Sequence, residues 1–243
     1  MKNYSEETYG ERIAGVYDQW YSEFDPAAIQ ALTEFALGGK ALELGIGTGR
    51  IAIPLLQNGV VIQGIDASES MVAKLRAKPG GESIPVTMGN FADVSVEGQF
   101  ALIYVVFNTF YSLLTQEEQI RCFQNVAKHL ASDGVFVIEA FVPDMARFTG
   151  RQAMRATQIG ENEVHIDVTQ VQPEKQLVST QHVVLTDQGT RFYPVKLRYI
   201  WHTEMDLMAR LCHLQLKERW GDWKKSRFTF EGGKHISVYE QEK

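Results

Sequence analysis

The chain has 243 residues, a formal net charge of −6 and 44% hydrophobic residues, a composition ordinary for a soluble globular protein. This length fits one large α/β domain with an insertion, or a domain with a small cap. The acidic balance argues against nucleic-acid binding. The chain shows neither a signal core nor an apolar run long enough to cross a bilayer, so we expect a cytoplasmic protein that binds no membrane.

The segment before the first strand is predicted to be helical. Aromatic and aliphatic residues recur at helical spacing over residues 9–21, which predicts one amphipathic helix. A second helix begins at Asp25-Pro26, which is a good pair for an N-cap and a first turn. Gly38-Gly39 ends this helix and leads into a buried strand.

Residues 41–50 form the stretch around which the chain is organised. They predict a short strand, a glycine turn and the start of a helix. Gly45 permits the turn, Gly47 leaves the backbone open to a ligand, and Gly49 lets the next helix pack closely. Asp66 ends the next apolar run, where an acidic side chain can accept hydrogen bonds from ribose hydroxyls. This half of the chain therefore predicts a nucleoside site.

Strands and helices alternate as far as residue 139, which predicts a mainly parallel sheet. The expected elements are a helix at 51–57, a helix capped by Ser68, strands at 84–88 and 100–106, a helix begun by the capping box Thr115–Glu118, and a strand at 135–138 that ends at Glu139. Residues 89–93 follow the third strand, where Asn90 can bond an adenine edge and Phe91 can cover the ring.

The pattern changes to a period of two over residues 163–201, with a hairpin turn at 187–189. This alternation predicts an antiparallel meander inserted after the fifth strand. Thr203 is expected to cap a short helix at 204–211, and two last strands are expected at 213–219 and 235–239. Cys122 and Cys212 are read as small buried apolar residues, and we predict no metal site.

A glycine turn with a ribose-binding acid fits either a dinucleotide or S-adenosylmethionine. A dinucleotide fingerprint has glycines at its first, third and sixth positions. Here the glycines are first, third and fifth, and the sixth position is Arg50, which would crowd a pyrophosphate. The chain also offers only one mononucleotide half.

These motifs resemble those of class I S-adenosylmethionine-dependent methyltransferases. The resemblance rests on Glu43–Arg50, Asp66, Gly89–Phe91 and Asp133–Gly134. The N-terminal segment with Tyr9 and Tyr17 is similar to the opening helix of the small-molecule branch, which includes amino-sugar N-methyltransferases. Those enzymes place a histidine near the end of the loop after strand four, where this chain has Ser112.

The resemblance implies a Rossmann-like α/β fold. Its seven-stranded, mainly parallel sheet would have helices on both faces and an antiparallel last strand. Residues 1–150 would form the cofactor-binding core with lid helices, 151–201 an inserted antiparallel substrate or lid meander, and 202–243 the return to the core. The implied cofactor-binding residues are Tyr9, Tyr17, Glu43, Gly45, Gly47, Gly49, Asp66, Ala67, Met71, Asn90, Phe91, Val106 and Phe107.

The implied function is methyl transfer from S-adenosylmethionine to a nitrogen or oxygen of a small-molecule acceptor. Candidate acceptor contacts are Tyr21, Asn108, Tyr111, Glu139, His182, Arg198 and Trp201. We name no catalytic residue, because a positioned nucleophile needs a base only when it carries a proton. The alternatives are a nicotinamide-dependent oxidoreductase and a non-catalytic S-adenosylmethionine-binding protein. The protein is expected to be a monomer or homodimer.

Overall fold

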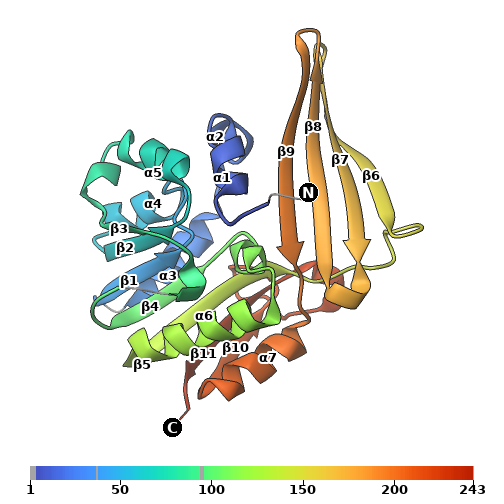
Figure 1. Ribbon diagram of the computed structural model, residues 1–243. Helices are drawn as coiled ribbons and strands as arrows, with labels where there is room; N and C mark the ends of the chain where they lie inside the picture. Colours follow the sequence, from blue (N-terminus) through green and yellow to red (C-terminus); the bar gives the residue numbers. More distant parts are fainter. Residues whose placement is uncertain (1–3, 37, 94–95, 243) are drawn as a thin grey trace.

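The computed structural model describes residues 4–36, 38–93 and 96–242, and these form two β-sheets (Figure 1). The larger sheet has seven strands in the order β10-β11-β5-β4-β1-β2-β3. Their bounds are Lys40–Leu44 (β1), Val61–Asp66 (β2), Val86–Met88 (β3), Phe100–Val105 (β4), Leu130–Phe141 (β5), Leu214–Trp220 (β10) and Lys234–Gln241 (β11). β11 is antiparallel to both neighbours, whereas β1 to β5 pair in parallel. The predicted Rossmann-like sheet is confirmed.

Helices cover both faces of this sheet, because successive strand residues are buried on opposite sides. On β4, Leu102 and Tyr104 pack in the core that contains α3 and α4. Ile103 and Val105 pack in the other core, with α6 and α7. The helices are α1 Thr8–Ile13, α2 Tyr17–Trp20, α3 Pro26–Ala36, α4 Ala52–Gln57, α5 Glu69–Arg76, α6 Gln116–His129 and α7 His202–Leu211. The capping box Thr115–Glu118 begins α6 as predicted.

The second sheet is an antiparallel meander in the order β6-β7-β8-β9, with bounds Gln152–Ile159, Glu163–Gln172, Leu177–Thr186 and Gly189–Arg198. It confirms the predicted meander and its tight turn before Gly189. The meander begins earlier than the period-two pattern indicated, because β6 is polar and mostly exposed and so shows no alternation. Figure 1 shows α1 and α2 between this sheet and α5, and both β9 and α5 contact α1.

Four predicted elements differ in detail. The single helix expected over 9–21 is two short helices, because the chain around Gly15 leaves the helical path before α2 begins. The third strand starts at Val86, since Pro85 has no N–H for the ladder. β5 runs on to Phe141 rather than ending at Glu139. α7 begins at His202 with Trp201 as its N-cap, so Thr203 is not the cap.

Two further predictions concern the cysteines and the membrane. Cys122 and Cys212 are free and buried in the core with α6 and α7, as predicted. Within the described ranges, no three histidine, cysteine or carboxylate side chains gather as a metal site requires. No helix in the part of the chain that the structure describes is long and apolar enough to cross a membrane.

We predict that Gly49→Ala destabilises the protein more than Gly59→Ala. Both glycines have left-handed backbones, with φ of 77° and 82°. A Cβ on Gly49 would lie 2.3 Å from Cδ1 of the fully buried Leu75, whereas one on Gly59 would meet no atom within 4 Å. Backbone strain alone would cost about 1–2 kcal/mol, and overpacking should add about 1–3 kcal/mol at Gly49. Urea unfolding measures the free energy of unfolding of both variants. Equal losses of stability would contradict the close packing of Gly49 against Leu75.

Candidate active site

A cavity of about 960 Å³ lies between the carboxyl ends of β1, β2 and β4 and the inner face of the four-stranded sheet. α1 and α2 contribute to its wall. The sequence-predicted residues that line it are Tyr9, Tyr17, Tyr21, Glu43, Gly45, Gly47, Asp66, Ala67, Met71, Asn90, Phe91, Val106, Phe107, Asn108 and His182. Among the predicted site residues, Gly49, Tyr111, Glu139, Arg198 and Trp201 do not belong to the described lining.

The turn after β1 exposes its backbone to this cavity. Gly45 and Gly47 have φ of 73° and 56°, a region that side chains disfavour. A Cβ on Gly45 would lie 2.5 Å from the methyl carbon of Thr109, so the loop after β4 approaches the turn closely. A Cβ on Gly47 would lie 3.3 Å from Cε of Met71. Gly49 packs against Leu75 instead and lies behind the turn.

The carboxylate of Asp66 holds this turn from β2. Its Oδ2 accepts the N–H of Gly47 at 2.7 Å, and its Oδ1 accepts the N–H of Ser68 at 2.9 Å. Burial raises the pKa of Asp66, while the N–H groups of Ser68 and Gly47 lower it. Asp66 therefore presents a hydrogen-bonded carboxyl group at the cavity wall, at the start of α5.

Glu43 is a buried acid beneath the turn. The hydroxyl of Tyr104 donates to its Oε2 at 2.8 Å. Burial raises the pKa of Glu43 to about 8, against an ordinary value of 4.5, and the nearby charge of Asp66 adds to the rise. Glu43 is therefore mostly protonated at neutral pH in this structure. A cation placed in the cavity would favour its ionised form.

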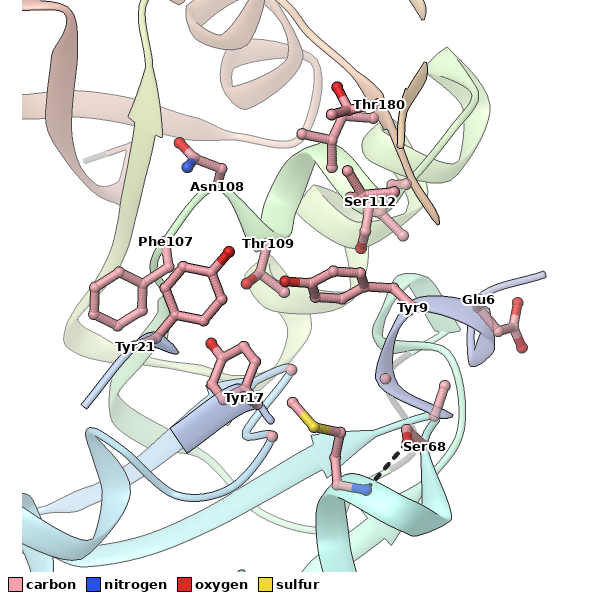
Figure 2. Close-up of a pocket in the computed structure, with 18 of the residues that line it drawn as sticks. Glu6, Tyr9, Tyr17, Tyr21, Ser68, Phe107, Asn108, Thr109, Ser112 and Thr180 are labelled. Carbon is pink, nitrogen blue, oxygen red and sulfur yellow. Dashed lines mark hydrogen bonds between the residues drawn. The ribbon is translucent and has the colours of Figure 1, made fainter. Parts of the chain in front are cut away.

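Three tyrosines of the N-terminal segment line the same space. Figure 2 shows the hydroxyl groups of Tyr9, Tyr17 and Tyr21 turned toward a common region beside Thr109. Burial raises the pKa of each of these tyrosines, so all three stay neutral donors at physiological pH. The rings of Tyr17 and Tyr21 lie 5.0 Å apart between centroids.

Hydrogen bonds fix this segment over the glycine turn and α5. Asp18 accepts the hydroxyl of Thr48 at 2.6 Å and pairs with Lys78 at 2.9 Å. Glu11 accepts the hydroxyl of Ser68 at 2.7 Å and the N–H of Ser70 at 3.0 Å. The two short helices are thus bound to the glycine turn after β1 and to α5, which follows Asp66.

Arg50 joins α2 to the loop after β4. Its guanidinium lies 3.4 Å from the ring centroid of Phe107, and the rings of Tyr17 and Tyr21 are 5.7 and 5.9 Å away. One terminal nitrogen donates to the carbonyl of Tyr21 at 3.0 Å. Its Nε is buried without a partner among the described residues. Arg50, which the sequence indicates as an obstacle to a pyrophosphate, packs in the cavity wall.

Comparison with known proteins identifies the family. Residues 41–134 match the family model described as "Methyltransferase domain". The structure of the CcbJ methyltransferase from Streptomyces caelestis shares 34% identity over 99% of this chain and 100% of that one, with a TM-score of 0.92. The chain belongs to the class I S-adenosylmethionine-dependent methyltransferases. This decides against the nicotinamide-dependent oxidoreductase.

Two other similar proteins carry more specific names. The "Cypemycin N-terminal methyltransferase" of Streptomyces sp is 25% identical over 209 residues, which are 84% of each chain. The sugar N-methyltransferase KedS8 from Streptoalloteichus sp has the same fold at 15% identity, with a TM-score of 0.67 over 93% of this chain and 92% of that one. Membership of this family makes the chain a methyltransferase and implies S-adenosylmethionine as its cofactor.

In the methyltransferase, Glu139 lies behind the cavity. It is 6% exposed within β5, and its Oε1 accepts bonds from Trp223 and Lys234, each at 3.1 Å. Its Oε2 accepts the N–H of Phe107 at 3.2 Å. The sequence makes Glu139 a candidate acceptor contact because the predicted strand ends there, whereas β5 continues to Phe141. Glu139 instead supports Phe107 and Asn108, whose φ angles of 55° and 66° are both left-handed.

Three other acceptor candidates point away from the cavity. The hydroxyl of Tyr111 donates to the carbonyl of Ile200 at 3.0 Å inside the core. Arg198 is buried and pairs with Glu204 at 2.8 Å. Trp201 is 37% exposed and stacks on Phe230. Tyr111 and Arg198 are held by partners far away in sequence, Ile200 and Gln119, which the sequence does not identify.

The four-stranded sheet supplies residues that the sequence analysis missed. Thr169 and Thr180 face each other across β7 and β8, with 2.9 Å between their hydroxyl oxygens, and both line the cavity. Figure 2 shows Thr180 across the cavity from Ser68. Asp167 lines it too and is the register partner of His182. Only the register of the hairpin, which the position of its turn fixes, could have paired these residues.

We predict that the ligand-free Glu43→Gln protein loses less stability than the wild type as the pH rises from 4.5 to 8. In the unfolded chain Glu43 loses its proton near pH 4.5, whereas in the folded chain it keeps it to about pH 8. Its stabilising contribution is therefore complete below pH 4.5 and is lost as the pH rises to 8. The free energy of unfolding of Glu43→Gln, relative to that of the wild type, should rise by about 3–5 kcal/mol from pH 4.5 to 8.

Denaturant unfolding at several pH values measures this difference. Glu82→Gln, which removes an exposed carboxylate next to α5, is the control and should leave the pH dependence unchanged. If Glu43→Gln and the wild type lose stability in parallel, the buried acid is not protonated in the folded protein.

Proposed function

We propose that the cavity binds S-adenosylmethionine at the glycine turn and a small amine against the four-stranded sheet. The supporting observation is one continuous cavity whose lining includes both the turn and the inner face of a sheet separate from the core. Its volume of about 960 Å³ lies at the upper end of the range for ligand pockets. This size supports the simultaneous binding of two molecules.

The residues around the turn suit the cofactor. Gly47 offers backbone that a Cβ would obstruct, and Asp66 offers a carboxyl group for the ribose hydroxyls. The apolar side chain of Met71 and the amide of Asn90 suit the adenine. We assign cofactor contacts to Tyr9, Tyr17, Glu43, Gly45, Gly47, Asp66, Ala67, Met71, Asn90, Phe91, Val106 and Phe107, and we leave out Gly49 because it packs behind the turn.

The acceptor would occupy the opposite part of the cavity, where residues 151–201 form the wall. Tyr21, Asn108 and His182 remain the acceptor contacts that we assign, together with Thr169 and Thr180. Nitrogen as the methylated atom is supported by the cypemycin N-terminal methyltransferase and the sugar N-methyltransferase, whose names specify nitrogen. An amine is also compatible with the carboxylate of Asp167 in the lining.

When bound, S-adenosylmethionine supplies a methyl group already activated on a sulfonium. The protein's residues then have to orient the acceptor and exclude water, and such positioning can contribute roughly 7–11 kcal/mol. Tyr9 and Tyr17 would cover the cofactor from the N-terminal side. The stack of Arg50 on Phe107 would close the side next to β4.

An acceptor screen tests this function. Alkylamines, amino sugars and short peptides with free N-termini are incubated with the protein and S-adenosylmethionine, and products are detected by mass. We expect a mass increase of one methyl group on an amine, with S-adenosylhomocysteine formed in equal amount. Gly47→Val is the control blocked in cofactor binding. Methylation of alcohols or phenols, with none of amines, would contradict the acceptor class.

We predict that Asp66→Ala weakens S-adenosylmethionine binding by about 1.5–3 kcal/mol, because charge-assisted hydrogen bonds to the ribose would be lost. Calorimetry measures the affinity, and thermal unfolding checks that the variant is folded. Asp93→Ala is the control, since Asp93 lies outside the cavity and pairs with Arg121 at the surface. Unchanged affinity in a folded Asp66→Ala protein would remove Asp66 from the site.

A further inference from the structure

Asp167 and His182 form a hydrogen-bonded pair on the wall assigned to the acceptor. They are register partners on β7 and β8, so their side chains leave the same face of the sheet. Oδ1 of Asp167 lies 2.5 Å from Nδ1 of His182. The next pair along this face is Thr169 with Thr180, and all four residues line the cavity.

This pairing determines which nitrogen of His182 is available. A carboxylate accepts hydrogen bonds, so Nδ1 carries the proton and the lone pair of a neutral ring lies on Nε2. No hydrogen-bond partner of Nε2 occurs among the described residues, and the His182 side chain is 23% exposed. His182 is also the one histidine among the described residues that line the cavity.

The pair lies close to the tyrosines of the N-terminal segment. Tyr193, the other register partner of His182, packs against Trp20 with 4.9 Å between ring centroids. Tyr21 follows Trp20 directly, and the charge of Asp167 contributes to its raised pKa after burial. The Asp167–His182 pair therefore belongs to the part of the cavity wall near Tyr21, which lines the same cavity.

We propose that His182, oriented by Asp167, is the general base that deprotonates the acceptor amine. The inference rests on the proposed function. The N–H bond of the bound ammonium breaks, its electron pair remains on the acceptor nitrogen, and the proton bonds to Nε2. Asp167 stabilises the resulting imidazolium through the Nδ1–H bond, and the proton then passes to water. The nitrogen lone pair becomes available inside the cavity, where an ammonium would be inert.

Nuclear magnetic resonance of ¹⁵N-histidine-labelled protein tests the orientation without an acceptor. The His182 signals, assigned with His182→Asn, should show the Nδ1–H tautomer both alone and with S-adenosylhomocysteine. Asp167→Asn should lose this preference, since an amide can also donate to Nδ1. An Nε2–H tautomer in the wild type would overturn the proposal.

Kinetics test the proton transfer, with the best alkylamine from the acceptor screen. His182→Asn keeps a donor for Asp167 but lacks Nε2, and it should lower kcat/KM for the alkylamine about 10²–10³-fold at neutral pH. This loss should shrink as the pH is raised and more of the alkylamine is free of its proton in solution. An aromatic amine, which is unprotonated at neutral pH, should lose less than about threefold. His165→Asn, on the same sheet but outside the lining, should keep the wild-type profile.

The outcomes separate the two proposals. Absence of transfer to any amine contradicts the acceptor class, and the tautomer measurement then decides the orientation of His182 by itself. Transfer by wild type together with an unchanged rate at neutral pH in His182→Asn overturns the general base. An equal loss for alkylamine and aromatic amine also overturns it, because that result means His182 only positions the acceptor.

Discussion

The carboxyl group of Asp66 joins the two loops on which the cavity depends. One oxygen accepts the N–H of Gly47 in the glycine turn after β1, and the other accepts the N–H of Ser68 between β2 and α5. The parallel order of these neighbouring strands brings the two loops to the same edge of the sheet. Gly47 adopts the left-handed backbone of this turn, with φ of 56°, without the strain that a side chain would add. The glycine turn, Asp66 and Ser68 form a corner around which the rest of the cavity is arranged.

The N-terminal segment depends on the same corner. Its carboxylates Asp18 and Glu11 are bound by Thr48 of the turn and by Ser68 at the cap of α5. Arg50, at the end of the turn, packs between the aromatic rings of α2 and Phe107. The two short helices therefore take their position from the glycine turn and α5. On its other side, α1 packs on β9 of the four-stranded sheet.

The core and the glycine-turn end of the cavity could be predicted because their signals are local. The glycines, Asp66 and the Ser68 cap are adjacent to strands with clear periods, and parallel strands must end at one edge. Of the acceptor candidates, only Tyr21, Asn108 and His182 belong to the described lining of the cavity. Glu139 and Arg198 have polar partners far away in sequence, Trp223 and Gln119, and these partners hold them away from the cavity. Asp167 could be paired with His182 only from the register of the β7–β8 hairpin.

The separateness of the four-stranded sheet has an evolutionary consequence. None of its described strands pairs with the seven-stranded sheet, and its inner face supplies the threonine pair, the Asp167–His182 pair and Val195 to the cavity. Substitutions on that face can change the shape and polarity offered to an acceptor while the strands that carry the glycine turn keep their packing. A lineage with this architecture can therefore vary the wall that we assign to the acceptor by point mutations on one sheet face, without altering a strand pairing of the seven-stranded sheet.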